Sequence, residues 1–209
     1  NHPELRAYAA IGDLQIAADH AFRAADLDQL RGIEGNAARA YFAQWSDIFP
    51  EGPLHFPGRV RRPPKDPVNA LLSFSYVLLA GFLQGLLIAH GLDPSAELYH
   101  SNGRGAPALT LDLLEVFRHP IADRFVFYCF HKRLLTPADF HPILTGAVML
   151  VENARKKALV KWEEWLDTRQ RWQRNRPKTP AKELIHDEID RFAAALDRDA
   201  LYDPFVLEA

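Results

Sequence analysis

The sequence predicts an all-α fold. Apolar residues recur at intervals of three and four over most of its 209 residues, which is the period of an amphipathic helix. The 15 prolines and 11 glycines fall in a few clusters that separate these stretches. Hydrophobic residues make up 48% of the chain and charged residues 25%, as in a globular protein. We therefore expect one multi-helix domain over residues 1–209, with no internal repeat.

Two amphipathic helices are predicted first, over residues 3–23 and 26–46. Pro3 suits the first turn of the first helix, where its missing N–H costs no hydrogen bond. The stretch after them, residues 47–67, is crowded with proline and glycine, and we expect a long loop there. Loops of that length are uncommon inside compact domains and tend to be functional or mobile.

The next predicted helix, over residues 67–90, is apolar on almost every side. It opens with Asp66 as the N-cap and Pro67 at the first helical position. Polar residues interrupt the apolar run too often for a membrane span, so we interpret the helix as the buried centre of the core. The interrupting residues are Asn69, Ser73, Ser75, Gln84 and His90.

The second half of the chain continues the helical pattern after an irregular stretch at residues 91–109. Short helices are expected over residues 110–119 and 120–135, although VFYCF in the second of these would also suit a strand. A turn at Thr136–Asp139 separates them from the remaining elements. These are a long amphipathic helix over 143–174, a second proline-containing loop over 176–182, and a last helix over 181–199.

The chain carries one cysteine, Cys129, so an internal disulfide is excluded. No signal peptide precedes the first helix, which agrees with a cytoplasmic protein. Because the first residue is Asn1, we expect the sequence to begin inside a longer, processed or truncated chain.

The net charge of −2 conceals two basic segments. One is RVRRPPK at residues 59–65, and the other runs from 154 to 182, where ten basic residues face three acidic ones. Such segments can follow a phosphate backbone, but a solvated helix face gives the same pattern. Trp162 and Trp165 lie on one helix face at i,i+3, and we expect them to dock this helix rather than stack on bases.

The segment ELYHSNGRGAPALTLDLLEVFR, residues 97–118, is a candidate metal site. Thr110 is placed to cap a helix that carries Asp112 and Glu115 on one face, three residues apart. Acids in a first turn also suit the helix dipole without any function. The glycines between 101 and 106 would let the chain reverse and bring His100 back against this face.

An imidazole and carboxylates together are typical ligands for Mn²⁺ or Mg²⁺. A site of this kind needs a further acid, and Glu34 in RGIEGNAARAYF is the candidate. It lies on a helix face of small and apolar residues, where solvation explains a carboxylate poorly.

Three segments together resemble the CRISPR-associated integrase family of spacer acquisition, the "Cas one" proteins. They are RGIEGNAARAYF at 31–42, RRPPKDPVNALLSFSYVLL at 61–79, and LYH with LTLDLLEVFRHPIADRF at 98–125. They occur in the family's order and at about its spacing. The resemblance extends from about residue 5 to the final YDPF.

The resemblance implies a metal held by Glu34, His100 and Glu115, with Asp112 as the other acid of the catalytic set. Many relatives have aspartate where this chain has Glu115. Asn69 and Tyr76 match polar positions near the family's active site and would support it. The family's N-terminal β-rich domain is not found in this chain, so the resemblance implies the helical catalytic domain alone.

The resemblance also implies that a DNA 3′-hydroxyl attacks a phosphodiester with Mg²⁺ or Mn²⁺ as cofactor, and that water in its place gives endonuclease activity. The implied partners are double-stranded DNA (prespacer and CRISPR repeat), a second copy in the full-length family, the small "Cas two" protein, and a "Cas four"-type nuclease, fused or separate; no membrane is implied. Basic residues of the two segments would hold DNA by its phosphates. They are Arg59, Arg61, Arg62, Lys65, Arg155, Lys156, Lys161 and Arg174.

Two other functions are open to this sequence. The first is a non-catalytic DNA-binding or assembly module of the same complex, in which the acids serve only the fold. The second, a phosphohydrolase acting on small nucleotides, has little support. The sequence contains no HD pair in a suitable helix, no GxxxxGK[ST] loop and no HExxH.

Overall fold

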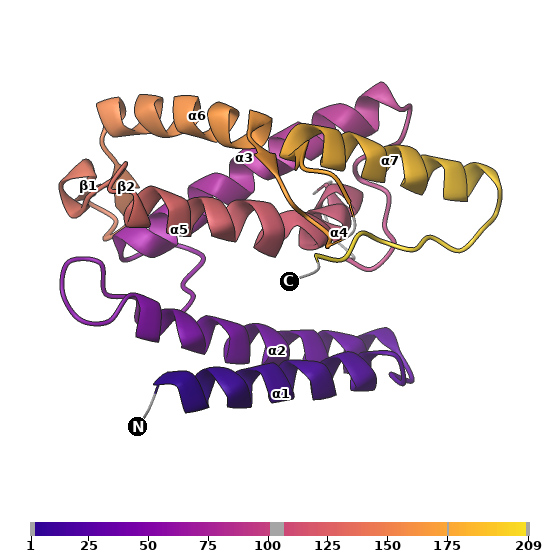
Figure 1. Cartoon of the computed structure of the whole chain (residues 1–209), viewed down its shortest axis with the longest axis horizontal. Helices are drawn as coiled ribbons and strands as arrows, with labels where there is room; N and C mark the ends of the chain where they lie inside the picture. The colour runs from indigo at the N-terminus through magenta and orange to yellow at the C-terminus, as the bar shows by residue number, and fades with distance from the viewer. Residues whose placement is uncertain (1–2, 101–106, 175, 208–209) are drawn as a thin grey trace. The chain divides into compact units, whose positions relative to one another are not determined.

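The computed structural model describes residues 3–100, 107–174 and 176–207. Helices dominate this part of the chain (Figure 1), which confirms the all-α prediction. The strands in it are short and form two two-stranded sheets. The chain divides into two compact units. We call residues 1–70 with 141–149 the hairpin unit, and residues 71–140 with 150–209 the main unit.

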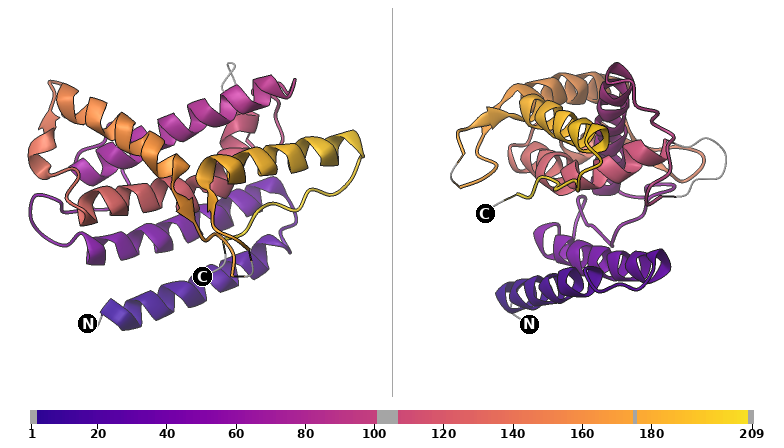
Figure 2. Two further views of the ribbon diagram at one scale, coloured as in Figure 1. Left: turned by 45° about the horizontal axis from the view of Figure 1, so that its top comes forward. Right: turned by 90° about the vertical axis from the view of Figure 1, so that its right-hand side faces the viewer.

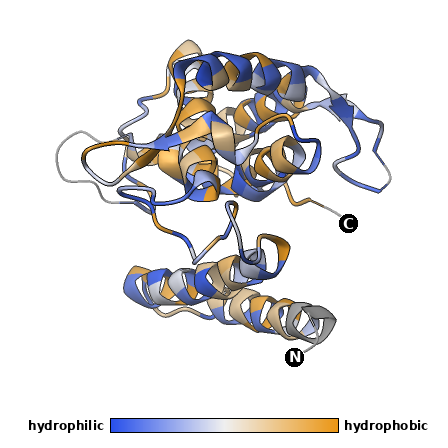
Figure 3. Cartoon of the chain, turned by 90° about the vertical axis from the view of Figure 1, so that its left-hand side faces the viewer, coloured by the Kyte–Doolittle hydropathy of each residue, from blue (hydrophilic) through white to orange (hydrophobic). Residues whose placement is uncertain are grey.

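The hairpin unit contains helices α1 (Pro3–Ala21) and α2 (Leu27–Ile48), close to the two predicted ranges. The helices run side by side (Figure 2), and each carries hydrophobic and hydrophilic residues in alternation (Figure 3). Asp26 caps α2, because its carboxylate accepts a 2.7 Å hydrogen bond from the Gln29 N–H. The two predicted helices are therefore present, and they pair as a helical hairpin.

An aromatic cluster folds the start of the long loop back onto α2. Trp45 and Phe56 are buried with ring centroids 5.6 Å apart, and Phe42 and Phe49 border them. The Ser46 hydroxyl donates to the Phe56 carbonyl at 2.9 Å. The predicted loop is thus anchored by aromatic burial rather than by regular secondary structure.

Helix α3 (Pro67–Ala89) begins as predicted, with the Asp66 carboxylate 2.8 Å from the Asn69 N–H. By length and hydropathy α3 could cross a membrane, and 33% of its most apolar window is buried. Its inner face is a core face, since Leu79, Leu83 and Leu87 are fully buried. Ser75 is buried as well, and its hydroxyl donates to the Leu71 carbonyl.

The segment predicted as two short helices is one nearly continuous helical stretch. It comprises α4 (Ala108–Phe117), a π-helical turn η1 (Arg118–Asp123) and α5 (Arg124–His131). VFYCF is therefore helical. π-Helical turns insert an extra residue per turn and are frequent at functional sites.

The predicted role of Thr110 as a cap is wrong. Helix α4 begins two residues earlier, with Pro107 at the N-cap, and Thr110 is fully buried inside it. The Thr110 hydroxyl has no hydrogen-bond partner among the described residues. Asp112 accordingly falls beyond the first turn, so the helix dipole does not explain its position.

The prediction of one helix over 143–174 is also wrong, because a hairpin and an extended segment flank a shorter helix. The 3₁₀ turn Pro137–Asp139 with its Thr136 capping box confirms the predicted turn at 136–139. It leads into β1 (Phe140–Pro142) and β2 (Val148–Leu150), joined by a turn with Gly146 at φ 76°. Helix α6 then covers only Glu152–Asp167.

After α6 the chain forms β3 (Arg169–Gln170) and β4 (Thr179–Pro180), paired antiparallel, and then α7 (Ala181–Asp197). Helix α7 lies along the second half of α3, where the Phe82 and His186 rings meet edge to face with centroids 6.0 Å apart. The His90 ring and the Asp190 carboxylate, 3.5 Å apart, join the same two helices.

Both tryptophans of α6 dock it onto α5, as predicted. The Trp162 ring meets Phe125 edge to face at 5.1 Å, and the Trp165 ring stacks on Tyr128 at 5.0 Å. The Trp165 indole N–H also donates to the Ile121 carbonyl at 3.1 Å. These rings are buried and are part of the core.

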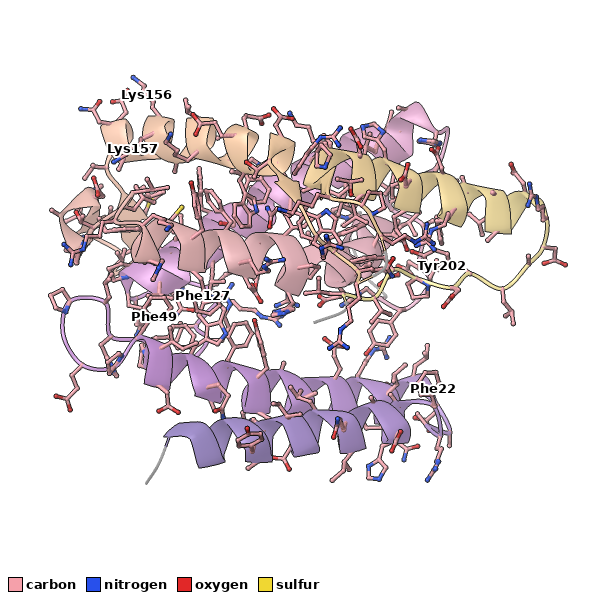
Figure 4. The ribbon with its side chains drawn as sticks, in the orientation of Figure 1. Phe22, Phe49, Phe127, Lys156, Lys157 and Tyr202 are labelled. Carbon is pink, nitrogen blue, oxygen red and sulfur yellow. The ribbon has the colours of Figure 1, made fainter. Side chains whose placement is uncertain are left out.

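A buried carboxylate fastens the C-terminal segment to α7. Glu188 is 1% exposed and accepts hydrogen bonds from the Tyr202 hydroxyl, the Phe205 N–H and the Arg191 guanidinium. Tyr202 lies on the segment after α7 (Figure 4). Burial, and then its bond to Glu188, raise the pKa of Tyr202 well above its usual value. The terminal YDPF is thereby part of the main unit.

Candidate metal centre and basic surfaces

The structure brings His100 and Asp112 together at the N-terminal half of α4. The Asp112 carboxylate accepts hydrogen bonds from the Tyr99 and His100 N–H groups, both at 3.0 Å. Its Oδ1 also lies 2.5 Å from Nδ1 of the His100 ring. His100 therefore lies against Asp112, whereas the reversal predicted at residues 101–106 lies outside the described part of the chain.

This contact defines the orientation of the imidazole. A carboxylate on Nδ1 keeps the proton there and leaves Nε2 as the lone-pair nitrogen. Metal-binding histidines are commonly held in this way, with the carboxylate fixing the tautomer and the ring direction. Asp112 accordingly holds both the backbone and the ring of His100 in place.

Glu115, one turn further along α4, is held by a guanidinium. Both carboxylate oxygens lie within hydrogen-bonding distance of Nη1 of Arg118, at 2.6 and 2.7 Å. The Glu115 side chain is 38% exposed, whereas that of Arg118 is 13% exposed. The pair thus lies at the edge of the core, with the carboxylate toward solvent.

Tyr76 of α3 supports the same guanidinium. Cζ of Arg118 lies 4.7 Å from the centroid of the Tyr76 ring. The Tyr76 hydroxyl donates at 2.6 Å to Asp123, a carboxylate 2% exposed on the π-helical turn. Burial by itself would lower the pKa of Arg118, but the neighbouring Glu115 and Tyr76 raise it above its usual value. Arg118 therefore remains a cation.

Glu34, the third expected ligand, lies half-buried on α2 in the hairpin unit. Among the described residues, no three histidine, cysteine, aspartate or glutamate side chains gather closely enough to hold one metal ion. The ligand set Glu34, His100 and Glu115 consequently stays a prediction.

The chemistry of the donors nevertheless fits a divalent cation. An imidazole nitrogen oriented by a carboxylate, together with partly exposed glutamate oxygens, suits Mn²⁺, and Mg²⁺ with more bound water. Arg118 and Asp123 were not expected from the sequence. The ion pair of Arg118 could have been predicted from its i,i+3 spacing to Glu115. The hydrogen bond between Tyr76 and Asp123 has no such sequence signal, because the two residues are 47 positions apart.

Asn69, in the first turn of α3, holds the start of the first basic segment in place. It is fully buried, and its amide accepts from the Val60 N–H and the Arg59 guanidinium and donates to the Gly58 carbonyl. This pins the loop at 58–60 against the first turn of α3. The positions of Arg61, Arg62 and Lys65, all exposed, follow from that anchor.

A basic pocket of about 500 Å³ lies between this loop and α2 within the hairpin unit. Arg39, Arg59 and Arg61 line it together with small residues of α2 and the ring of Phe42. No acidic side chain is among its lining residues. A cavity of this composition suits an anionic group.

The second basic segment is partly neutralised. Lys156, near the start of α6 (Figure 4), pairs with Glu152 at 2.8 Å, and Lys161 pairs with Glu164 at 2.7 Å. Lys182, on α7, bridges Glu163 and Asp167. Arg155 and Arg174 are exposed. Three of the ten basic residues of the segment are therefore paired with carboxylates.

Comparisons with known proteins converge on one family. The family model described as "CRISPR associated protein Cas1" matches residues 1–164. The CRISPR-associated endonuclease Cas1 1 of Thermus thermophilus is 39% identical over 187 residues, covering 88% of this chain and 57% of that protein. Cas1 2 of Rhodospirillum rubrum is 43% identical over 68% of this chain and 42% of that protein. The chain spans about half the length of the curated relatives it matches.

Solved structures agree in fold. The Cas1 protein TM1797 from Thermotoga maritima superimposes with a TM-score of 0.78 at 24% identity, covering 92% of this chain and 60% of that one. A structure titled "Casposase bound to integration product" gives a TM-score of 0.76 at 19% identity, covering 93% and 57%. With the family model and the identity to its relatives, this chain belongs to the CRISPR-associated Cas1 family.

Proposed function

We propose that this chain is the helical catalytic region of a metal-dependent DNA integrase and endonuclease of CRISPR spacer acquisition. The observation that carries the proposal is the orientation of His100 by Asp112, one turn from the Glu115 carboxylate. Relatives named CRISPR-associated endonucleases support the reaction class.

His100 through Nε2, with the carboxylates of Glu115 and Glu34, would hold Mg²⁺ or Mn²⁺. Bound there, the ion would activate a DNA 3′-hydroxyl or a water molecule and stabilise charge on the scissile phosphate. Asp112 keeps the His100 ring in one tautomer and one direction while DNA binds and leaves. Because the attacking hydroxyl belongs to DNA or water, no side chain of the protein needs to form a covalent intermediate.

DNA would be held by its phosphates. The exposed residues Arg61, Arg62 and Lys65 and the arginine-lined pocket beside them offer the cationic groups of the hairpin unit. Arg155, Lys156, Lys161 and Arg174 offer those of the main unit. Such interactions give affinity that depends on salt and carries little sequence information.

A non-catalytic DNA-binding or assembly module is the second candidate. The ion pair between Glu115 and Arg118 favours it, since a purely structural glutamate would have the same partner. Mn²⁺ separates the two functions. Mn²⁺ should raise the Tm of a catalytic chain, because the ion binds the folded state, whereas the Tm of an inert module should not change.

The names of relatives support the proposed partners. One solved structure is titled "Cas6-RT-Cas1--Cas2 complex", and a curated protein of Geobacter sulfurreducens is a Cas4/Cas1 fusion. We propose that this chain likewise acts in the cytoplasm with a Cas2 protein and a second copy of itself. A Cas4-type nuclease, fused or separate, would complete the assembly on prespacer and repeat DNA.

The proposal is tested with Glu34→Gln and Glu115→Gln in a strand-transfer assay on double-stranded DNA with Mn²⁺. We expect each to lower the rate by about two orders of magnitude or more, because each removes an ion ligand. DNA affinity should stay within about twofold, since neither residue is basic. The matched control is Glu183→Gln, an exposed acid in the first turn of α7. Activity retained by both ligand variants would overturn the assignment.

A further inference from the structure

The Glu115 carboxylate already has a cation bound to it. Both of its oxygens lie within 2.7 Å of Nη1 of Arg118. The guanidinium therefore occupies the side of the Glu115 carboxylate that faces Arg118. A metal ion that binds Glu115 would share the carboxylate with Arg118 or displace it. Two cations on one carboxylate repel each other, and this repulsion weakens the binding of either.

Arg118 is not free to move away. Its side chain is 13% exposed, and its guanidinium lies over the Tyr76 ring at 4.7 Å. Tyr76 in turn is fixed, because its hydroxyl donates at 2.6 Å to Asp123, which is buried in the π-helical turn. The chain from Asp123 through Tyr76 to Arg118 therefore holds a positive charge at a defined place beside Glu115.

We propose that Arg118 is a built-in competitor of the metal ion: it positions the Glu115 carboxylate and lowers the affinity of the site for divalent cations. The inference rests on the proposed function only in taking Glu115 as an ion ligand. It assigns to Arg118, Tyr76 and Asp123 a role beyond packing, which is to set the affinity of the site for divalent cations.

The competition has a functional consequence. A weakened site binds the ion more tightly when other negative groups offset the guanidinium, and DNA phosphates at the site would supply them. Arg118 would thus couple metal binding to DNA binding, since each ligand raises the affinity for the other by the same factor.

The test measures Mn²⁺ binding to the full chain by titration calorimetry, without DNA and without any activity assay. Arg118→Gln removes the charge and keeps a hydrogen-bonding side chain. We expect its Mn²⁺ Kd to fall by about three- to tenfold relative to the unsubstituted chain. A merely structural arginine predicts the reverse, because its loss would disorder Glu115 and weaken binding.

Two further variants keep the test decisive. Arg118→Lys retains the charge while losing the planar fork, so its Kd should stay within about twofold. Arg124→Gln removes the same charge six residues on, where the guanidinium lies over Trp172 instead, and should change Kd by less than about twofold. Circular dichroism spectra confirm that each variant is folded.

The outcomes separate this proposal from the one before it. If Glu115→Gln binds Mn²⁺ as well as the unsubstituted chain does, Glu115 is not a ligand and the metal centre itself is refuted. If Glu115→Gln weakens binding while Arg118→Gln leaves it unchanged or weaker, the metal centre stands and the competition is refuted. Equal tightening by the glutamine and lysine variants would also refute it, because charge would then not be the cause.

Discussion

At the scale of single residues, Asp112 and Arg118 contact the candidate ligands His100 and Glu115, respectively, and their expected effects on metal binding are opposite. Asp112 accepts three hydrogen bonds from the segment that carries His100, two from backbone N–H groups and one from the ring. Arg118 neutralises Glu115. In the proposed site, Asp112 would orient a ligand of the ion and Arg118 would compete for one, although both are charged residues of the same helical stretch.

Replacing Asp112 by asparagine should therefore weaken metal binding. The amide can no longer hold the proton on Nδ1 as a carboxylate does, so Nε2 is no longer reserved for the ion. We expect Mn²⁺ affinity to fall by about 10- to 100-fold, the usual effect of losing such a partner. Titration calorimetry measures this, with Asp93→Asn, an exposed loop acid bonded to Ser95, as the control. Unchanged affinity would show that His100 does not bind the ion.

At the scale of elements, helix α6 is attached to the core by its tryptophans. Trp165 is 8% exposed, stacks on Tyr128 of α5 and donates to the Ile121 carbonyl in the π-helical turn. That carbonyl lies where the helical hydrogen-bond pattern is irregular. The Ile121 carbonyl accepts there from the Arg124 N–H, and the indole of α6 is its second donor.

Trp165→Phe should lower the free energy of unfolding by about 2 kcal/mol. The phenyl ring keeps most of the apolar packing, but it loses the indole hydrogen bond to the Ile121 carbonyl and leaves a small cavity beside Tyr128. Urea denaturation followed by circular dichroism measures the change. Val160→Ala, at an exposed position of the same helix, should stay within about 0.5 kcal/mol. Equal effects of both variants would mean that Trp165 does not anchor α6.

The same elements show what could be predicted from the sequence. The start of α3 was predictable because its signals, Asp66 and Pro67, are local. The end of α6 was not. Apolar and basic residues keep a helical rhythm past Asp167, yet the chain there is extended and Trp172 is buried, with its indole N–H donating to the Thr179 carbonyl. Thr110 was misplaced for a similar reason, since a good capping residue became a core residue once α4 began earlier.

Some features of the candidate site could also be predicted from the sequence, and others could not. The contact between His100 and Asp112 was expected, but the glycines on which that expectation was based lie outside the described residues. The i,i+3 spacing alone did not separate the roles of the two acids, because it places both on one face without saying which is held by a backbone N–H and which by an arginine. Only the family resemblance distinguished them. Asp123 was missed because its partner, Tyr76, lies on another helix.

At the scale of the whole molecule, free positive charge is unevenly distributed. Lys156 and Lys161 of α6 and Lys182 of α7 have carboxylate partners. The residues Arg61, Arg62 and Lys65 are instead exposed beside a pocket lined by arginine and no acid. An ammonium already paired with two carboxylates gains little from a DNA phosphate, since the existing pairs must be given up. The loop at 59–65 is therefore expected to contribute more to DNA binding per residue than the longer basic segment does.

A salt series tests this distribution. For double-stranded DNA, the slope of log Kobs against log salt concentration changes by about 0.9 for each phosphate that the protein no longer neutralises. Replacing Arg61, Arg62 and Lys65 together by glutamine should make the slope shallower by about two to three and weaken binding at every sequence tried. Lys182→Gln, which removes an ammonium held by Glu163 and Asp167, should change it by less than about 0.5. Fluorescence anisotropy between about 50 and 200 mM salt measures both, and a larger change for Lys182→Gln would place the DNA on α7 rather than on the loop.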